Sequence, residues 1–163
     1  MATSILPYQK NGRLVLRVAE VPEHELGTLA ATRADELLTR AYPGDAGFDL
    51  YCQGEHRIGP GESIDVPLGV RVQLPEGWWG LLTGRSSTLR KRGLLVAQGV
   101  IDQGYRGPLY AYVHNMTEEM VRVRDGERLA QLIPLPLFPG GTVLVDDLDD
   151  HARGTQGFGS SGA

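Results

Sequence analysis

Glycine and proline interrupt this chain so often that long regular elements have little room. The 163 residues include 22 glycines and 10 prolines, and short apolar runs, several alternating with polar residues, lie between them. Alternation with a period of two is typical of strands that bury one face, and Gly or Pro between such runs marks a turn. The sequence therefore predicts an all-β protein made of many short strands.

The length predicts one domain with its own hydrophobic core. We expect an N-terminal extension over 1–12, a β domain over 13–145 and a flexible Gly-rich C-terminal arm over 146–163. One short helix is expected over 87–92, and one or two helical turns within 22–40. The expected strands and short apolar runs lie at 13–18, 48–52, 63–66, 70–74, 80–82, 94–96, 109–113, 121–123 and 129–133.

The composition argues against several classes of partner. Asp and Glu number 20 against 16 Lys and Arg, a net charge of −4, whereas nonspecific nucleic-acid binding favours a basic surface. No apolar run is long enough to span a membrane. The single cysteine, Cys52, cannot form an internal disulfide, and with no signal-peptide pattern we expect a cytoplasmic protein.

One segment, residues 99–107, brings several residues suited to catalysis close together in the sequence. It places a carboxylate, Asp102, after an apolar pair and before a glycine, an aromatic residue and an arginine. This pattern predicts a β-hairpin with Asp102 at its tip. Gly99, Gly104 and Gly107 would allow tight turning and close approach to a ligand.

The C-terminus after an acidic run at 146–150 is rich in Gly and Ser, which on its own predicts a disordered tail. Arg153 and Phe158 are unusual in such a tail. A guanidinium that binds phosphate and a ring that covers a base would together form a clamp. Both interpretations stay open from composition alone.

Five segments in order resemble the motifs of the trimeric dUTPase family, and the resemblance covers roughly residues 13 to 163. It implies a distorted jelly-roll, or β-clip, fold and a homotrimer with shared active sites. It also implies hydrolysis of dUTP to dUMP and pyrophosphate, which keeps uracil out of DNA and supplies dUMP for thymidylate synthesis. The five segments are 41–50, 84–87, 99–107, 126–132 and 153–162.

The resemblance assigns roles to individual residues. Asp102 would be the general base that activates water, and Mg²⁺ would enter with the triphosphate. Asp49 would hold metal-bound waters, although a structural role at a strand end is equally open, and Arg128 could contact ligand or pair structurally. The implied substrate-binding residues are Arg85, Ser86, Ser87, Val96, Gly99, Val100, Ile101, Asp102, Tyr105, Tyr110, Gln131, Arg153, Phe158 and Gly159.

Base and sugar selection follow from the same resemblance. Tyr105 would pack beneath the deoxyribose and leave no room for a 2′-hydroxyl. The backbone near Val96 and Val100 would meet the uracil edge. In the arm, Phe158 would stack on uracil and Arg153 would reach the γ-phosphate.

Some positions depart from the family pattern. Val96 stands where many members have Asn, which points to recognition of uracil through the main chain. Tyr110 stands where many have Lys, and Gly84 replaces a common proline. Ser87 is often glycine, so its backbone N–H is expected to matter more than its hydroxyl.

Two alternatives come from other classes. A dCTP deaminase of the same fold would need a glutamate ten residues after Asp102, where this chain has Tyr112. A dUTP-responsive regulatory protein would need a partner-binding segment, for which 22–40 is the candidate.

Overall fold

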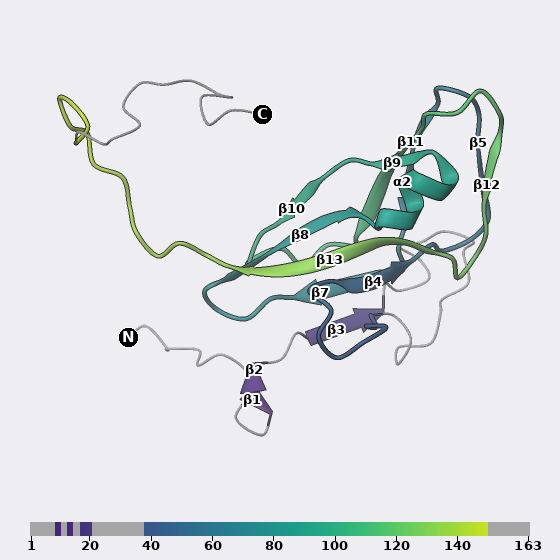
Figure 1. Ribbon diagram of the computed structural model, residues 1–163. Coiled ribbons are helices and arrows are strands. Elements are labelled where there is room, and N and C mark those ends of the chain that lie inside the picture. The colour runs from purple at the N-terminus through teal and green to yellow at the C-terminus, as the bar shows by residue number, and fades with distance from the viewer. Residues whose placement is uncertain (1–8, 11–12, 15–16, 21–37, 150–163) are drawn as a thin grey trace.

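The largest sheet has four antiparallel strands in the order β10-β8-β13-β4 (Figure 1). This computed structural model describes residues 9–10, 13–14, 17–20 and 38–149. The long strands β8 and β13 lie side by side at the centre of the sheet, with β10 and β4 at its edges. The strands of this sheet are β4 (Phe48–Tyr51), β8 (Trp78–Gly84), β10 (Gly99–Ile101) and β13 (Arg128–Pro136).

The remaining strands form one three-stranded sheet and three antiparallel pairs. The three-stranded sheet has the order β6-β11-β9, with β6 at Ser63–Pro67, β11 at Tyr110–Asn115 and β9 at Leu94–Val96. The pairs are β5 (His56–Ile58) with β12 (Val121–Val123), β3 (Arg17–Glu20) with β7 (Val70–Gln73), and β1 (Gln9–Lys10) with β2 (Arg13–Leu14).

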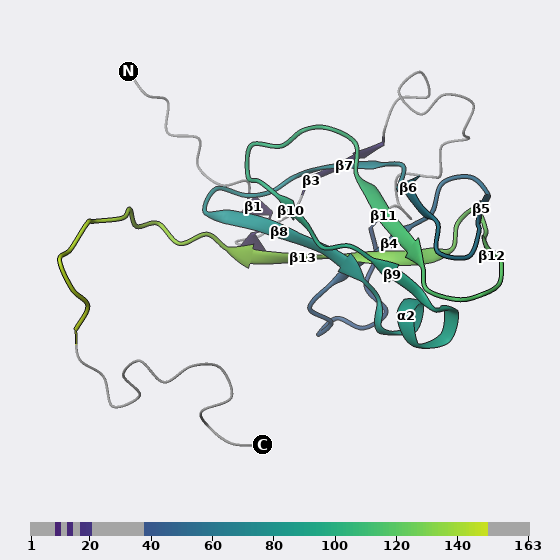
Figure 2. The ribbon, with the colours of Figure 1, turned by 90° about the horizontal axis from the view of Figure 1, so that it is seen from above.

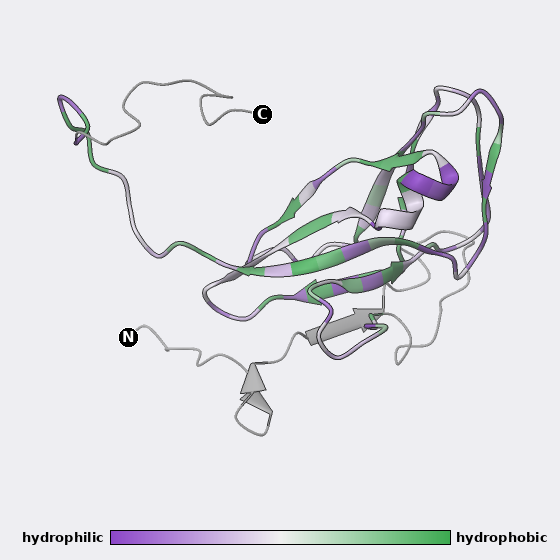
Figure 3. Cartoon of the chain, in the orientation of Figure 1, coloured by the Kyte–Doolittle hydropathy of each residue, from purple (hydrophilic) through white to green (hydrophobic). Residues whose placement is uncertain are grey.

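The core forms where the buried faces of these strands meet. In β11 alternate residues are buried, which places Ala111, Val113 and Asn115 inside and Tyr110 and Tyr112 outside. Figure 3 shows hydrophobic positions along β4, β8 and β13, interrupted by hydrophilic ones. The largest fully buried apolar side chains are Leu50, Ile58, Val66, Leu68, Val70, Leu94, Leu109, Leu129 and Leu132.

In the described residues the one helix is α2 (Ser86–Arg92), which follows β8 directly. It ends because Gly93 adopts the left-handed conformation (φ 64°, ψ 21°) and its N–H bonds to the carbonyl of Leu89. Thr88 is the buried residue of α2, and its hydroxyl donates a 2.8 Å hydrogen bond to the carbonyl of Leu129 in β13. This bond fixes α2 to the central sheet.

Most of the expected elements are found. The helix expected over 87–92 is confirmed as α2, and strands occur at each expected run from 48–52 to 129–133. The strand expected over 13–18 takes part in two separate pairings, β2 with β1 and β3 with β7. The helical turns expected in 22–40 lie almost wholly outside the described residues, as does the arm from 150 onward.

The hairpin predicted for 99–107 is wrong in its pairing. The turn exists, because the N–H of Tyr105 donates to the carbonyl of Asp102 over 3.0 Å. The chain after it does not return along β10, which pairs with β8. Leu109 instead bonds to the backbone of β7 and of Leu68, and this leads the chain into the other sheet as β11.

The C-terminal segment leaves the body of the protein at the end of β13. Figures 1 and 2 show residues 137–149 running away from the sheets at the end opposite α2. Their apolar side chains lie in solvent, with Phe138 78% and Leu144 98% exposed. The boundary expected at 145 stays a prediction.

Candidate functional site

The first part of the candidate site lies where β8 ends and α2 begins. Arg85 has extended backbone angles (φ −77°, ψ 153°), and the chain turns into the helix at Ser86. The N–H of Thr88 bonds to the carbonyl of Arg85 over 3.0 Å. The Arg85 side chain is therefore carried by a short and well-anchored junction.

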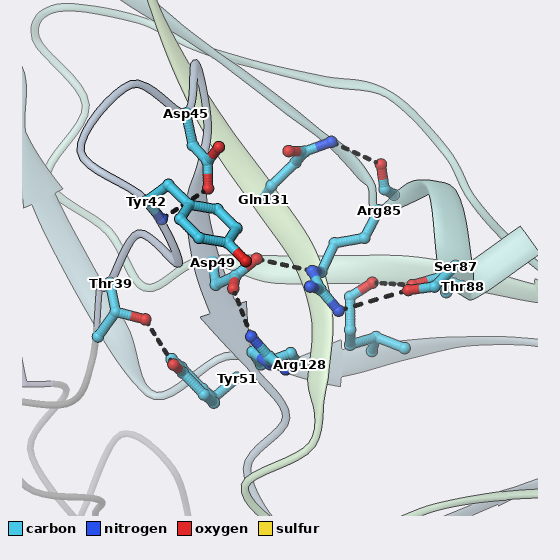
Figure 4. A network of polar contacts seen from close by, with 12 residues as sticks. Thr39, Tyr42, Asp45, Asp49, Tyr51, Arg85, Ser87, Thr88, Arg128 and Gln131 are labelled. Carbon is cyan, nitrogen blue, oxygen red and sulfur yellow. Dashed lines mark hydrogen bonds and ion pairs between the residues drawn. The ribbon is translucent and has the colours of Figure 1, made fainter.

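Asp49 of β4 holds that arginine by an ion pair (Figure 4). Nε of Arg85 lies 2.6 Å from Oδ1 of Asp49, and Nη1 of Arg128 lies 3.3 Å from Oδ2. The Asp49 side chain is 11% exposed, so this carboxylate is almost wholly enclosed. A buried charge must be paired, and two guanidinium groups supply the pairing here.

Gln131 lies beside the pair because β13 aligns it with both neighbours. It is opposite Asp49 of β4 and opposite Thr83 of β8. Its Nε2 donates a 3.0 Å hydrogen bond to the carbonyl of Gly84. A Cβ on Gly47 would lie 2.5 Å from Oε1 of Gln131, so position 47 must be glycine for this side chain to stay in place.

Two open pockets flank α2, and Arg85 lines both. One, of about 270 Å³, is lined by Gly84, Ser86, Leu89 and Val96 among others. The other, of about 310 Å³, has a basic lining that includes Ser87, Lys91, Arg92 and Arg128. An arginine between two pockets, one of them basic, is suited to a polyanionic ligand.

The second part of the candidate site is the turn after β10, which carries Asp102 at the surface. The turn is braced by its own side chains. Oε1 of Gln103 accepts a 2.9 Å hydrogen bond from the N–H of Gly77, and Nη1 of Arg106 donates to the carbonyls of Gln103 (2.8 Å) and Tyr105 (2.7 Å). Asp102 is therefore an exposed carboxylate on a firmly held backbone.

Tyr105 is held within the same turn. Its hydroxyl donates to the carbonyl of Pro108 over 2.9 Å, and the side chain is 42% exposed. A Cβ on Gly107 would lie 2.4 Å from the Tyr105 hydroxyl oxygen. The absence of a side chain at Gly107 therefore makes room for the Tyr105 ring.

Within one chain the two parts lie at opposite ends of β8. Ile101 pairs with Gly80, near the start of that strand, whereas Arg85 follows its last residue. At roughly 3.3 Å per residue, the five steps from Gly80 to Arg85 place Ile101 about 17 Å from the arginine along β8, and Asp102 lies one residue further away. One chain alone does not bring the carboxylate and the arginine cluster together.

The other predicted residues lie near one of the two parts of the site or outside the residues that the structure describes. Gly99, Val100 and Ile101 form β10, and Val100 is 66% exposed. Val96 lines the pocket beside Gly84, whereas Tyr110 begins β11 and is 42% exposed. The remaining predicted residues, Arg153, Phe158 and Gly159, lie outside the described residues.

Sequence reasoning gave no role to two supporting residues. Thr88 and Gly47 act on the site through packing and one buried hydrogen bond. Arg128 was left open between ligand contact and structural pairing, and the structure pairs it with Asp49.

Cys52 and the possible metal ligands also bear on the chemistry of the site. Burial raises the pKa of the Cys52 thiol to about 12, so it is inert as a nucleophile. Among the residues with described side chains, no cluster of three His, Cys, Asp or Glu is suited to hold a metal ion. Mg²⁺ prefers oxygen donors, and the carboxylate of Asp49 is a donor of that kind.

In the described part of the chain, no helix is both long enough and apolar enough to cross a membrane.

By its fold and its arginine cluster, the protein is a β protein with a candidate polyanion site. The family model described as dUTPase matches residues 33–162. The deoxyuridine 5′-triphosphate nucleotidohydrolase of Leifsonia xyli subsp. xyli (strain CTCB07) is 43% identical over 132 residues, 79% of this chain and 87% of that protein. The chain belongs to the dUTPase family.

Other relatives agree. The enzyme of the same name from Cutibacterium acnes (strain DSM 16379 / KPA171202) is 42% identical over 125 residues, 75% of this chain and 82% of that protein. The structure of Staphylococcus bacteriophage 80alpha dUTPase with dUPNHPP matches with a TM-score of 0.79 at 28% identity, covering 91% of this chain and 99% of that chain. The expected jelly-roll-like β fold is confirmed.

Proposed function

We propose that this protein hydrolyses dUTP to dUMP and pyrophosphate, which keeps uracil out of DNA and supplies dUMP for thymidylate synthesis. The observation that carries the proposal is that the chain has both an arginine cluster at the start of α2 and an exposed carboxylate on a braced turn. The family membership identifies the chemistry that such a pair performs. The nucleotide-bound 80alpha dUTPase structure supports a deoxyuridine nucleotide as the ligand.

Asp102 is the proposed general base. Its carboxylate accepts a proton from water, the water oxygen bonds to the α-phosphorus, and the bond to the bridging oxygen of the β-phosphate breaks. Pyrophosphate leaves and dUMP remains. A well-placed base of this kind contributes about 10²–10⁴-fold to the rate.

The arginine cluster is the proposed triphosphate site. Arg85 and the backbone N–H groups of Ser86 and Ser87 bind phosphate oxygens, and Gln131 contacts the α-phosphate. Mg²⁺ bound to the triphosphate would offset its negative charge. Asp49, as the buried carboxylate beside Arg85, is the predicted holder of metal-bound water.

The base and sugar meet the segment around β10. We propose that the backbone of Gly99, Val100 and Ile101, with Val96, reads the uracil edge, while Tyr105 packs beneath the deoxyribose. Tyr110 is an adjoining contact. Arg153, Phe158 and Gly159 of the arm are proposed to cover the bound nucleotide.

A homotrimer is proposed because one chain leaves the site incomplete. The separation of about 17 Å along β8 keeps Asp102 away from its own Arg85. A neighbouring copy can supply the missing half, and the exposed segment 137–149 gives the arm reach toward another subunit. Light scattering after size exclusion should give three times the 17.7 kDa chain mass. A cytoplasmic location stays a prediction.

Product analysis tests the reaction. Purified protein with Mg²⁺ is incubated with dUTP and with dCTP, and the nucleotides are separated. We expect dUMP and pyrophosphate from dUTP, with dCTP unchanged. Uracil nucleotide formed from dCTP would support the deaminase alternative instead, and inertness to both would contradict hydrolysis.

A further inference from the structure

We propose that Asp49 is a positioning residue: its carboxylate fixes the Arg85 guanidinium for the triphosphate, and Arg128 holds Asp49 in turn. The inference rests on the proposed function, since it concerns how that substrate is held. It assigns Asp49 an action through Arg85, in addition to the contact with metal-bound water proposed above.

The first argument for this proposal is which nitrogen atoms of Arg85 are held by protein groups. Arginine has five N–H donors in a rigid plane. Nε of Arg85 lies 2.6 Å from Oδ1 of Asp49 in an ion pair, and Nη1 donates a 3.4 Å hydrogen bond to the hydroxyl of Ser87. These two contacts hold the guanidinium on its Nε and Nη1 side, so that among the described residues the Nη2 donors remain for a ligand. Figure 4 shows this arrangement, with Asp49 between the two arginines.

The rigidity of Asp49 carries the second step. Its backbone N–H bonds to the carbonyl of Thr39 over 2.6 Å, and its residue lies opposite Gln131 in the sheet. The side chain is 11% exposed, whereas that of Arg128 is 48% exposed. A buried carboxylate on a paired strand is a fixed reference point, so a guanidinium attached to it needs little rearrangement when ligand binds.

The charges carry the third step. Arg85 and Arg128 both approach Asp49, one on each carboxylate oxygen. Without the carboxylate, two like charges would face each other across a small, partly enclosed space. With it, the group keeps one net positive charge for the ligand. Each carboxylate oxygen lies within ion-pair distance of one guanidinium group, which ties Asp49 to both arginines.

The test compares binding of dUPNHPP to wild type, Asp49→Asn, Arg85→Gln and the double variant, in Mg²⁺ and in EDTA. Asp49→Asn should weaken binding about tenfold or more in both buffers, because the ion pair with Arg85 does not depend on Mg²⁺. The double variant should bind no more weakly than Arg85→Gln alone, because Asp49 acts through Arg85. Additive losses, or a loss confined to Mg²⁺, would overturn the proposal.

Controls keep this test separate from the proposed function. Asp65→Asn removes an exposed carboxylate of β6 and should bind like wild type. In turnover assays Asp49→Asn should raise KM far more than it lowers kcat. If Asp49→Asn does not fold, Asp49→Glu takes its place in the test. Because it keeps the carboxylate, it should keep part of the wild-type binding of dUPNHPP, and a complete loss of binding would count against the proposal. Wild type that neither binds dUPNHPP nor cleaves dUTP would refute the proposed function itself.

Discussion

At the scale of single residues, Asp102 combines exposure with a fixed backbone. The bracing by Gln103 and Arg106 means that the carboxylate can be altered without loosening the turn. Asp102→Asn should therefore lower kcat by about 10²–10⁴-fold, because the amide cannot accept the water proton. Steady-state kinetics measures this, and dUPNHPP binding and the melting temperature should stay near wild type. Turnover within a few-fold of wild type would exclude Asp102 as the base.

Cys52 makes a prediction about pH. Its pKa rises from 9.0 to about 12 on folding because the thiol is buried. Between these values the unfolded chain releases the proton and the folded chain keeps it, so the free energy of unfolding falls as pH rises. Urea titrations at pH 8 and pH 10.5 should show a larger drop for wild type than for Cys52→Ala. Equal drops would mean that another group causes the alkaline loss.

Residue types carried much of the chemical prediction. A carboxylate ahead of a glycine and an aromatic residue located the Asp102 turn, and Arg85 stood out as a phosphate ligand. The pairing of Asp49 with Arg85 could not be predicted, because it depends on how β4, β13 and β8 align. That alignment is set by contacts between segments far apart in the chain.

At the scale of elements, α2 depends on one buried hydrogen bond. Thr88→Val keeps the shape of the side chain but leaves the carbonyl of Leu129 without the 2.8 Å bond from Oγ1. The free energy of unfolding should fall by about 1–3 kcal/mol, the cost of an unsatisfied buried acceptor. Urea denaturation measures the change, with Thr88→Ser as the matched control that keeps the hydroxyl. A loss as large in Thr88→Ser would assign the effect to packing.

The strands and the helix could be predicted from local sequence patterns, but the pairing of the strands could not. Period-two alternation found the strands, and Gly93 marked the end of α2, since both are local signals. The hairpin expected after β10 failed because its partner was chosen by tertiary contacts. Leu109 is 1% exposed, and burying it draws the chain toward β7 and away from β10. The local sequence pattern does not show whether the chain after the turn pairs with β7 or with β10.

At the scale of the whole molecule, the site is divided. The arginine cluster and Asp102 lie toward opposite ends of the same strand, which is why we propose that a working centre combines two copies of the chain. The segment 137–149 fits this account. It leaves the body of the protein opposite α2, and Phe138, Val143 and Leu144 are 78%, 83% and 98% exposed.

Subunit mixing tests this central claim most directly. Asp102→Asn and Arg85→Gln chains carrying different tags are coexpressed, and mixed oligomers are purified through both tags. Each inactive parent lacks one half of every site, so mixed oligomers contain some sites with both halves intact. We predict dUTP hydrolysis well above either parent, and no recovery when the Asp102→Asn/Arg85→Gln double variant is assembled alone. Mixed oligomers no more active than the average of the two parents would show that each site is built within one chain and would contradict the account.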